Sequence, residues 1–177
     1  MAGEIYIKEQ PNILVSGELT GLRTWEASLL LSEYLLSLPL QGKSVLELGV
    51  GTGLSSIVAS KLGAKVLSTD GSEQVIQKLQ DHFALNSAEI DTGTLWWDED
   101  DEDILHGRRW DFVFGVDITY DEDVCSALAE TYRLAIQYGG VGILAATIRN
   151  ENTVKLAFVT ECSTANLTLF LHILLIS

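Results

Sequence analysis

The sequence has 177 residues, of which 47% are hydrophobic and 20% are charged, and its net charge is −14, from 25 acidic and 11 basic residues. This composition is that of a globular chain and excludes a disordered one, and the length suits a single domain with a substantial core. The negative charge disfavours nucleic acid and anionic membranes as partners, so we expect neutral or basic partners.

The first 23 residues are predicted to form an N-terminal extension. Two short β-like pieces, 5–7 and 13–15, are separated by turn-forming residues and predict a hairpin over the core. A helix is expected from Thr24, because apolar residues then recur at helical spacing until Pro39 ends the pattern. The apolar stripe of this helix should pack against a sheet.

Three glycines at alternate positions follow a short apolar run. Gly49, Gly51 and Gly53 come directly after the run 45–48, and an amphipathic stretch begins at Leu54. This pattern predicts a strand, a tight turn and a helix. Glycines let the main chain turn sharply and let a ligand approach it, and the first helical turn presents free N–H groups.

An acid follows the second predicted strand. The strand 65–69 ends at Asp70, about 20 residues beyond the first glycine, which is the spacing at which a βαβ unit brings a carboxylate to a ribose hydroxyl. The glycine turn and Asp70 together predict a site for a nucleoside-bearing cofactor.

Strands and helices continue to alternate through the rest of the chain. After a helix capped by Ser72, the patterns predict strands over 92–97, 110–116, 139–147 and 167–176, and helices over 121–136 and near 151–160. The last strand is too short to span a bilayer and is expected in the core. This alternation predicts a mostly parallel α/β sheet, with ligands at the carboxyl ends of its strands.

Six consecutive acidic residues, 98–103, are expected to form a solvated loop, because like charges repel. A basic protein surface is a better partner for this run than a metal ion, so we expect no metal site. Cys125 and Cys162 match no metal-ligand spacing and suggest no disulfide framework, which favours a reducing compartment. With no apolar signal region and no transmembrane-length run, we expect a cytoplasmic protein. We also expect a monomer.

The residues around the glycines discriminate between nucleoside cofactors. A dinucleotide site would show Gly-x-Gly-x-x-Gly, but here the sixth position is Leu54 and the third glycine comes one residue early, at Gly53. Glu47, two residues before the first glycine, could bind an ammonium but would repel a pyrophosphate. The pattern departs from that of NAD sites and resembles motif I of the seven-stranded S-adenosylmethionine-dependent methyltransferases, whose cofactor carries an ammonium and no phosphate.

Further motifs extend this resemblance over roughly residues 12–160. The chain resembles the eukaryotic lysine-specific methyltransferase family 16 in Thr24-Trp25-Glu26-Ala27, Leu95-Trp96-Trp97 and Val116-Asp117-Ile118-Thr119-Tyr120. Within that group, residues 21–27 look most like the branch that methylates a lysine of eukaryotic elongation factor 2. The resemblance implies a Rossmann-like seven-β-strand methyltransferase domain over 24–177. Residues 166–177 depart from the family's closing strands, so we expect the C-terminal strands to be incomplete.

The resemblance also implies a set of cofactor-binding residues. They are Trp25, Gly49, Val50, Gly51, Asp70, Trp97 and Val116, and the glycine motif itself adds Glu47 and Gly53. Indoles at positions 25 and 97 offer flat apolar faces to the adenine or to the methionine portion of the cofactor. The adjacent Trp96 should point to the opposite face of the sheet and serve in packing.

Asp117 and Tyr120 match the family's Asp-x-x-Tyr motif and are the predicted catalytic residues. A lysine attacks the activated methyl group only as a neutral amine, so the site must orient its nitrogen and take up a proton. A carboxylate at the strand end can hold the incoming ammonium, and desolvation can lower the pKa of that ammonium. Asp117 could instead cap the 121–136 helix, and Tyr120 could form a wall of the substrate channel.

The sequence thus predicts an S-adenosylmethionine-dependent protein-lysine N-methyltransferase acting on a translation factor such as elongation factor 2. Three alternatives stay open. The protein could bind the cofactor without catalysis, as a shortened methyltransferase-like protein, or it could methylate a small molecule. An NAD-dependent oxidoreductase is disfavoured by the residues around the glycine turn.

Overall fold

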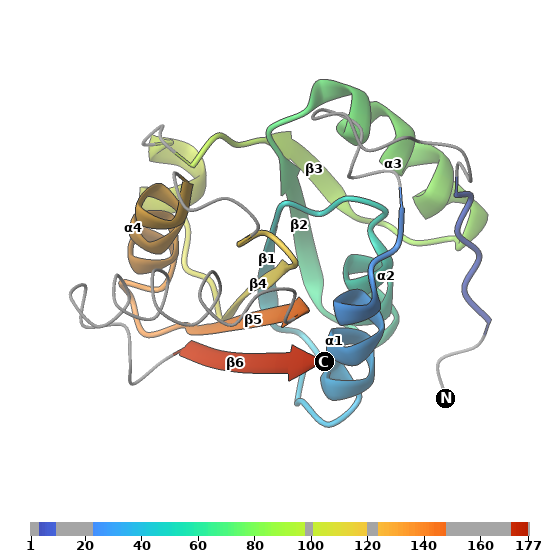
Figure 1. The fold of residues 1–177 in the computed structure, drawn as a ribbon, viewed down its shortest axis with the longest axis horizontal. Coiled ribbons are helices and arrows are strands. Elements are labelled where there is room, and N and C mark those ends of the chain that lie inside the picture. The colour runs from blue at the N-terminus through green and yellow to red at the C-terminus, as the bar shows by residue number, and fades with distance from the viewer. Residues whose placement is uncertain (1–3, 10–22, 98–100, 120–123, 148–170, 177) are drawn as a thin grey trace.

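The computed structural model describes residues 4–9, 23–97, 101–119, 124–147 and 171–176 (Figure 1). Its centre is a six-stranded sheet in the order β3-β2-β1-β4-β5-β6, in which every neighbouring pair is parallel. The strands are β1 (Ser44–Leu48), β2 (Lys65–Asp70), β3 (Asp91–Thr94), β4 (Phe112–Val116), β5 (Val141–Thr147) and β6 (Leu171–Ile176). The predicted parallel α/β sheet is confirmed.

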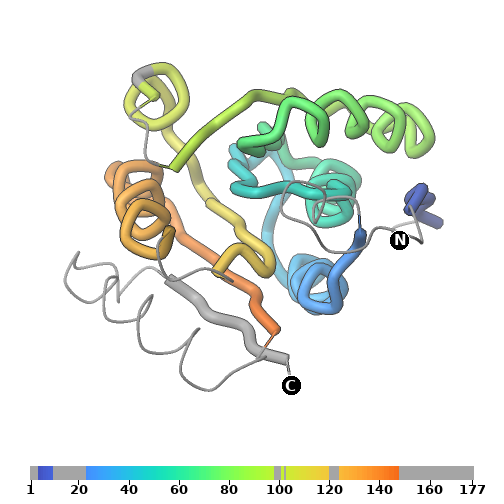
Figure 2. Tube along the Cα trace, turned by 45° about the horizontal axis from the view of Figure 1, so that its top comes forward, coloured from blue at the N-terminus to red at the C-terminus, as the bar shows by residue number. Residues whose placement is uncertain are grey.

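Helices cover both faces of the sheet, as predicted. They are α1 (Glu26–Leu35), α2 (Leu54–Lys61), α3 (Glu73–Leu85), α4 (Cys125–Ala135) and a short π-helical turn, η2 (Glu102–His106). In Figures 1 and 2, α1, α2 and α3 lie together on one side, and α4 lies on the other. Among the described helices, none is long and apolar enough to cross a membrane.

Alternate residues of the central strands feed two cores. On β4, Phe114 packs with α1 and α2, whereas Val113 packs with α4 and η2. On β1, Val45 and Leu46 divide in the same way. Side chains of a strand point to opposite faces in turn, so a strand covered on both sides needs an unbroken apolar run. This explains why the run at β4, and the run at β1 apart from Glu47, were recognisable in the sequence.

The strand β1 has β2 on one side and β4 on the other. At the amino end of β1, the Asp111 carboxylate accepts hydrogen bonds from the Ser44 N–H and the Lys43 ammonium, both at 2.9 Å. These bonds hold the pKa of Asp111 below its usual range. They fasten the amino ends of β1 and β4 to one another.

The first predicted strand of the N-terminal hairpin is not a strand in the structure. Residues 4–9 form no regular secondary structure, and the second piece, 13–15, lies outside the described residues. The first segment is held by a side chain of α3's end instead: Asn86 accepts from the Tyr6 N–H at 2.9 Å and donates to the Tyr6 carbonyl at 2.7 Å. The predicted helix near 151–160 also lies outside the described residues.

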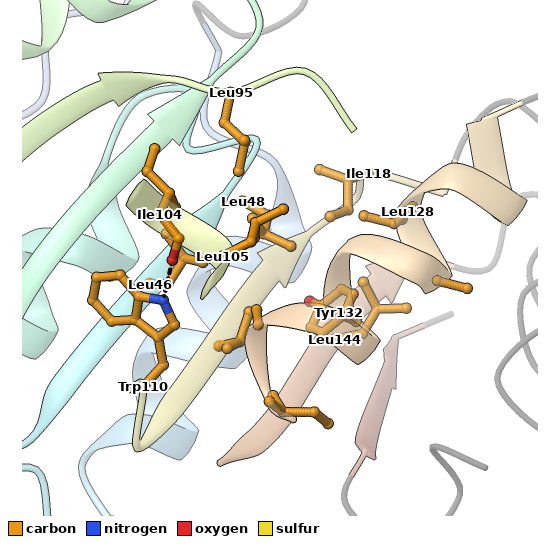
Figure 3. Packing of buried hydrophobic residues seen from close by; sticks show 14 of the residues in the cluster. Leu46, Leu48, Leu95, Ile104, Leu105, Trp110, Ile118, Leu128, Tyr132 and Leu144 are labelled. Carbon is orange, nitrogen blue, oxygen red and sulfur yellow. Dashed lines mark hydrogen bonds between the residues drawn. The ribbon is translucent and has the colours of Figure 1, made fainter. Parts of the chain in front are cut away.

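The acidic run is only partly a loop. Its last two residues begin η2, where the Asp101 carboxylate accepts a hydrogen bond from the Ile104 N–H at 2.7 Å. Ile104 and Leu105 are buried, and the Trp110 indole donates to the Ile104 carbonyl at 2.9 Å (Figure 3). Burial of this apolar pair outweighs the repulsion between the acids before it. In the ranges that the structure describes, no cluster of residues has the make-up of a metal site.

Candidate functional site

The strand order reverses between β1 and β4, because the chain runs outward from β1 to β3 and then crosses to β4. In open parallel sheets, ligands bind outside the carboxyl ends of the strands at such a point. The glycine turn follows β1 here, Asp70 ends β2, and Asp117 follows β4. The fold therefore brings three predicted groups to one end of the sheet.

The glycine turn requires glycine at two positions. Gly49 has φ +61°, and a Cβ there would lie 2.5 Å from the Ile118 side chain and 3.3 Å from the Trp97 indole. Gly53 has φ +79°, and a Cβ there would lie 2.8 Å from Leu79. L-residues rarely adopt this left-handed conformation, so substitution would add both strain and a clash. Gly51 also has a positive φ, +55°.

Asp70 joins the glycine turn to the start of α3. Its carboxylate accepts hydrogen bonds from the Gly51 N–H at 3.3 Å and from the Ser72 N–H at 3.0 Å. Burial raises the pKa of Asp70, and these two N–H donors oppose that rise. An ionised carboxylate has about four acceptor sites, so lone pairs are left over for a pair of hydroxyl groups. The ribose contact predicted from the sequence remains a prediction.

Glu47 is a buried acidic residue of β1. Its side chain is 2% exposed and accepts a hydrogen bond from the Ser56 hydroxyl of α2, which in turn lies 2.6 Å from the Ser68 hydroxyl of β2. Burial raises the pKa of Glu47 to about 7, against the lowering effect of the serine hydrogen bonds. The protein itself encloses the carboxylate. The Glu47 carboxylate is thus bonded to α2, and its contact with a cofactor ammonium stays a prediction.

This burial predicts how stability depends on pH. The folded chain keeps the Glu47 proton up to about pH 7, whereas the unfolded chain loses it near pH 4.5. Folding stability should therefore fall as pH rises through that window. Glu47→Gln should lack this part of the pH dependence. Between pH 4 and pH 8, the free energy of unfolding of the variant should therefore rise relative to that of the parent by roughly 3 kcal/mol. Urea unfolding at both pH values measures this, and parallel curves for the two proteins would contradict it.

The two predicted aromatic residues lie beside the glycine turn. The half-buried Trp97 faces Gly49 and packs against the core of α4. Trp25 precedes α1, with the Arg23 guanidinium 5.0 Å from its ring centroid. Its neighbour Thr24 lies 3.1 Å, hydroxyl to hydroxyl, from a threonine within the glycine turn. The Trp97 indole is therefore adjacent to the turn, whereas for Trp25 the contact runs through Thr24, and its place in a ligand site stays a prediction.

Val50 and Val116 use their side chains for packing. Val50 is buried in the cluster between α2 and α3. Val116 ends β4 and packs against the cluster that α1 covers. Val116 is only partly buried, and a cofactor contact at either position stays a prediction.

Asp117 is anchored to the end of β5. Its φ is +50°, and its carboxylate accepts hydrogen bonds from the Thr147 N–H at 2.6 Å and from the Thr147 hydroxyl at 2.9 Å. The next described helix, α4, has Val124 as its N-cap, so the helix-capping alternative for Asp117 is wrong. Tyr120 lies outside the described residues.

Three contributors to this region escaped the sequence analysis. Ile118 fills the space beside Gly49, Thr147 holds Asp117, and Trp96 is 54% exposed rather than packed. A local sequence signal existed for Trp96 alone: it lies between Leu95 and Trp97, which both face the core, so its own side chain points elsewhere. The other two contacts join segments that are distant in the sequence.

The fold and the glycine turn define a class of protein. A TehB-like S-adenosylmethionine-dependent methyltransferase from Corynebacterium glutamicum superposes with a TM-score of 0.61, at 17% identity, over 81% of this chain and 73% of that one. The fold is therefore that of the Rossmann-like methyltransferases.

The sequence identifies the family within this class. A family model described as lysine methyltransferase matches residues 8–163. Protein-lysine N-methyltransferase EFM3 of Saccharomyces cerevisiae is 37% identical over 90% of this chain and 53% of that protein. Protein N-lysine methyltransferase METTL21A of Xenopus tropicalis is 34% identical over 72% of this chain and 60% of that protein. The chain belongs to this lysine methyltransferase family, and it spans about half the length of EFM3.

The ribose assignment gives a binding prediction. Asp70→Ala should weaken binding of S-adenosylhomocysteine by roughly 10- to 100-fold, the equivalent of losing hydrogen bonds to a charged group. Asp111→Ala is the matched control, because the Asp111 carboxylate also accepts a main-chain N–H hydrogen bond, from Ser44, but at the amino end of the sheet. Calorimetric titration measures both. Unchanged affinity in a folded Asp70→Ala protein would remove Asp70 from the ribose site.

Proposed function

We propose that this protein is an S-adenosylmethionine-dependent protein-lysine N-methyltransferase. One observation carries the proposal: the glycine turn after β1, Asp70 at the end of β2 and Asp117 after β4 lie together at the point where the strand order reverses. The glycines leave the main chain accessible, and the Asp70 carboxylate has acceptor sites left for hydroxyl groups. These residues fit an adenosine-bearing cofactor.

S-adenosylmethionine supplies the activated methyl group in this chemistry. Asp70 would hold the ribose hydroxyls, and Trp25 and Trp97 would offer apolar faces to the rest of the ligand. Asp117 would attract the lysine ammonium, orient its nitrogen and accept its proton. The hydrogen bonds from Thr147 fix the Asp117 carboxylate for this purpose, so catalysis would be chiefly positioning.

The acceptor that we propose is a lysine on a translation factor such as elongation factor 2. The resemblance of residues 21–27 to the branch acting on that factor supports this choice. The net charge of −14 also favours a basic surface on the partner.

The test has a binding part and a turnover part. S-adenosylhomocysteine should raise the melting temperature and NAD should not, because ligands that bind only the folded state stabilise it. Incubation with labelled S-adenosylmethionine and purified elongation factor 2, followed by mass spectrometry, should then show a methylated lysine. If label appears only on another protein of a lysate, the translation-factor assignment fails. If the chain binds the cofactor and labels nothing, the enzymatic proposal fails in favour of a binding function.

A further inference from the structure

Trp96 is a large aromatic residue that the fold leaves exposed. Its side chain is 54% accessible to solvent, although the residues on either side of it turn inward: Leu95 is buried and Trp97 packs against the α4 core. Exposing an indole leaves a large apolar area in water. Trp96 is therefore not a core residue, unlike its two neighbours.

The indole of Trp96 covers Gly71. A Cβ placed on Gly71 would lie 3.2 Å from two carbon atoms of the six-membered ring. The ring thus lies over Gly71, in the space that a side chain at that position would take.

Gly71 directly follows Asp70, so the indole lies next to the predicted ribose site. The parallel register pairs Asp70 with Thr94, and the Leu95 N–H donates a hydrogen bond to the Asp70 carbonyl at 3.2 Å. Trp96 is therefore fixed beside Asp70 by the pairing of β2 with β3. If Asp70 holds the ribose, the base attached to that ribose would lie near the Asp70 carboxylate.

We propose that Trp96 belongs to the cofactor site, where its exposed indole face stacks on the adenine of the nucleoside whose ribose Asp70 holds. This inference rests on the proposed function. Aromatic side chains stack on nucleobases through flat π faces, and such contacts contribute measurably to affinity. A residue at position 71 with a side chain would compete for the same place, so the glycine there serves the indole.

The experiment compares Trp96→Ala and Trp96→Phe with the parent protein by calorimetric titration of S-adenosylhomocysteine. Affinity should fall roughly 5- to 100-fold in the alanine variant and stay within about threefold in the phenylalanine variant, which keeps an aromatic face. Titration with 5′-methylthioadenosine, which retains the adenosine, should show the same fold-losses. Tyr138→Ala is the matched control, because Tyr138 is 46% exposed but precedes β5, at the amino end of the sheet. Its affinity should equal that of the parent.

The outcomes separate the two proposals. If the parent protein binds neither ligand, the proposed function fails. If the parent binds both and Trp96→Ala, with an unchanged melting temperature, binds them equally well, the stacking inference alone is overturned. A Trp96→Ala protein with normal cofactor affinity but a raised KM for the protein acceptor would assign the indole to the partner surface instead, and would also overturn it.

Discussion

Asp117→Asn should lower the rate of methyl transfer by about 10²–10⁴-fold, the usual range for loss of general acid–base catalysis. The amide can neither attract an ammonium by charge nor accept its proton. Asparagine adopts positive φ readily, so the main chain at φ +50° should be preserved. The amide oxygen can still accept a hydrogen bond from Thr147, which keeps the loop in place. Affinity for S-adenosylhomocysteine should therefore stay within about twofold of the parent.

Single-turnover methylation and calorimetry measure these two quantities separately. Thr147→Ser and Thr147→Val form the matched pair, because only the serine variant keeps a hydroxyl for the Asp117 carboxylate. The serine variant should turn over like the parent and the valine variant should be slower. Equal turnover in Asp117→Asn and the parent would remove Asp117 from the mechanism.

Gly49→Ala should destabilise the fold by about 2–4 kcal/mol, as the sum of left-handed backbone strain and overpacking. The new methyl group would meet Ile118 at 2.5 Å in a residue with φ +61°. Gly42→Ala separates the two causes, because Gly42 has φ +74° and nothing within 4 Å of a Cβ. This control should lose only about 1–2 kcal/mol, from strain alone.

Urea unfolding of both variants gives the comparison. Equal losses at positions 42 and 49 would show that the contact with Ile118 relaxes without cost. The cofactor should also bind more weakly to folded Gly49→Ala than to Gly42→Ala, because only the first substitution lies in the turn that the ligand approaches.

The helices and strands could be predicted because the spacing of apolar residues and the helix caps are local features of the sequence. Helical spacing of Ala27, Leu31 and Leu35 indicated α1, and all three are buried as expected. Ser72 caps α3 as expected, through a hydrogen bond from the Val75 N–H. The η2 turn was missed because charge dominates its sequence, whereas the burial of the apolar residues that follow decides its structure.

The sequence predicted which residues follow the central strands, but it did not predict their side-chain contacts. The number of residues between the glycines and Asp70 could be interpreted because the length of a βαβ unit sets the distance from its first turn to the end of its second strand. The surroundings of Glu47 depend instead on Ser56 of α2 and Ser68 of β2. Both serines are distant from Glu47 in the sequence, so no local pattern predicts this contact. Alternation predicted packing for Trp96, and it could not show that Trp96 would lie over Gly71 and stay exposed.

The central place of β1 also sets the order in which the chain can fold. Its Ser44 N–H bonds to Asp111, 67 residues further along, so during synthesis β1 can pair with β2 long before β4 emerges from the ribosome. Until then one side of the innermost strand keeps unpaired N–H and C=O groups, a template on which other chains can associate. Pairing across so long a separation is also slow. We therefore expect that open side of β1 to be the place where other chains associate before β4 has paired with it.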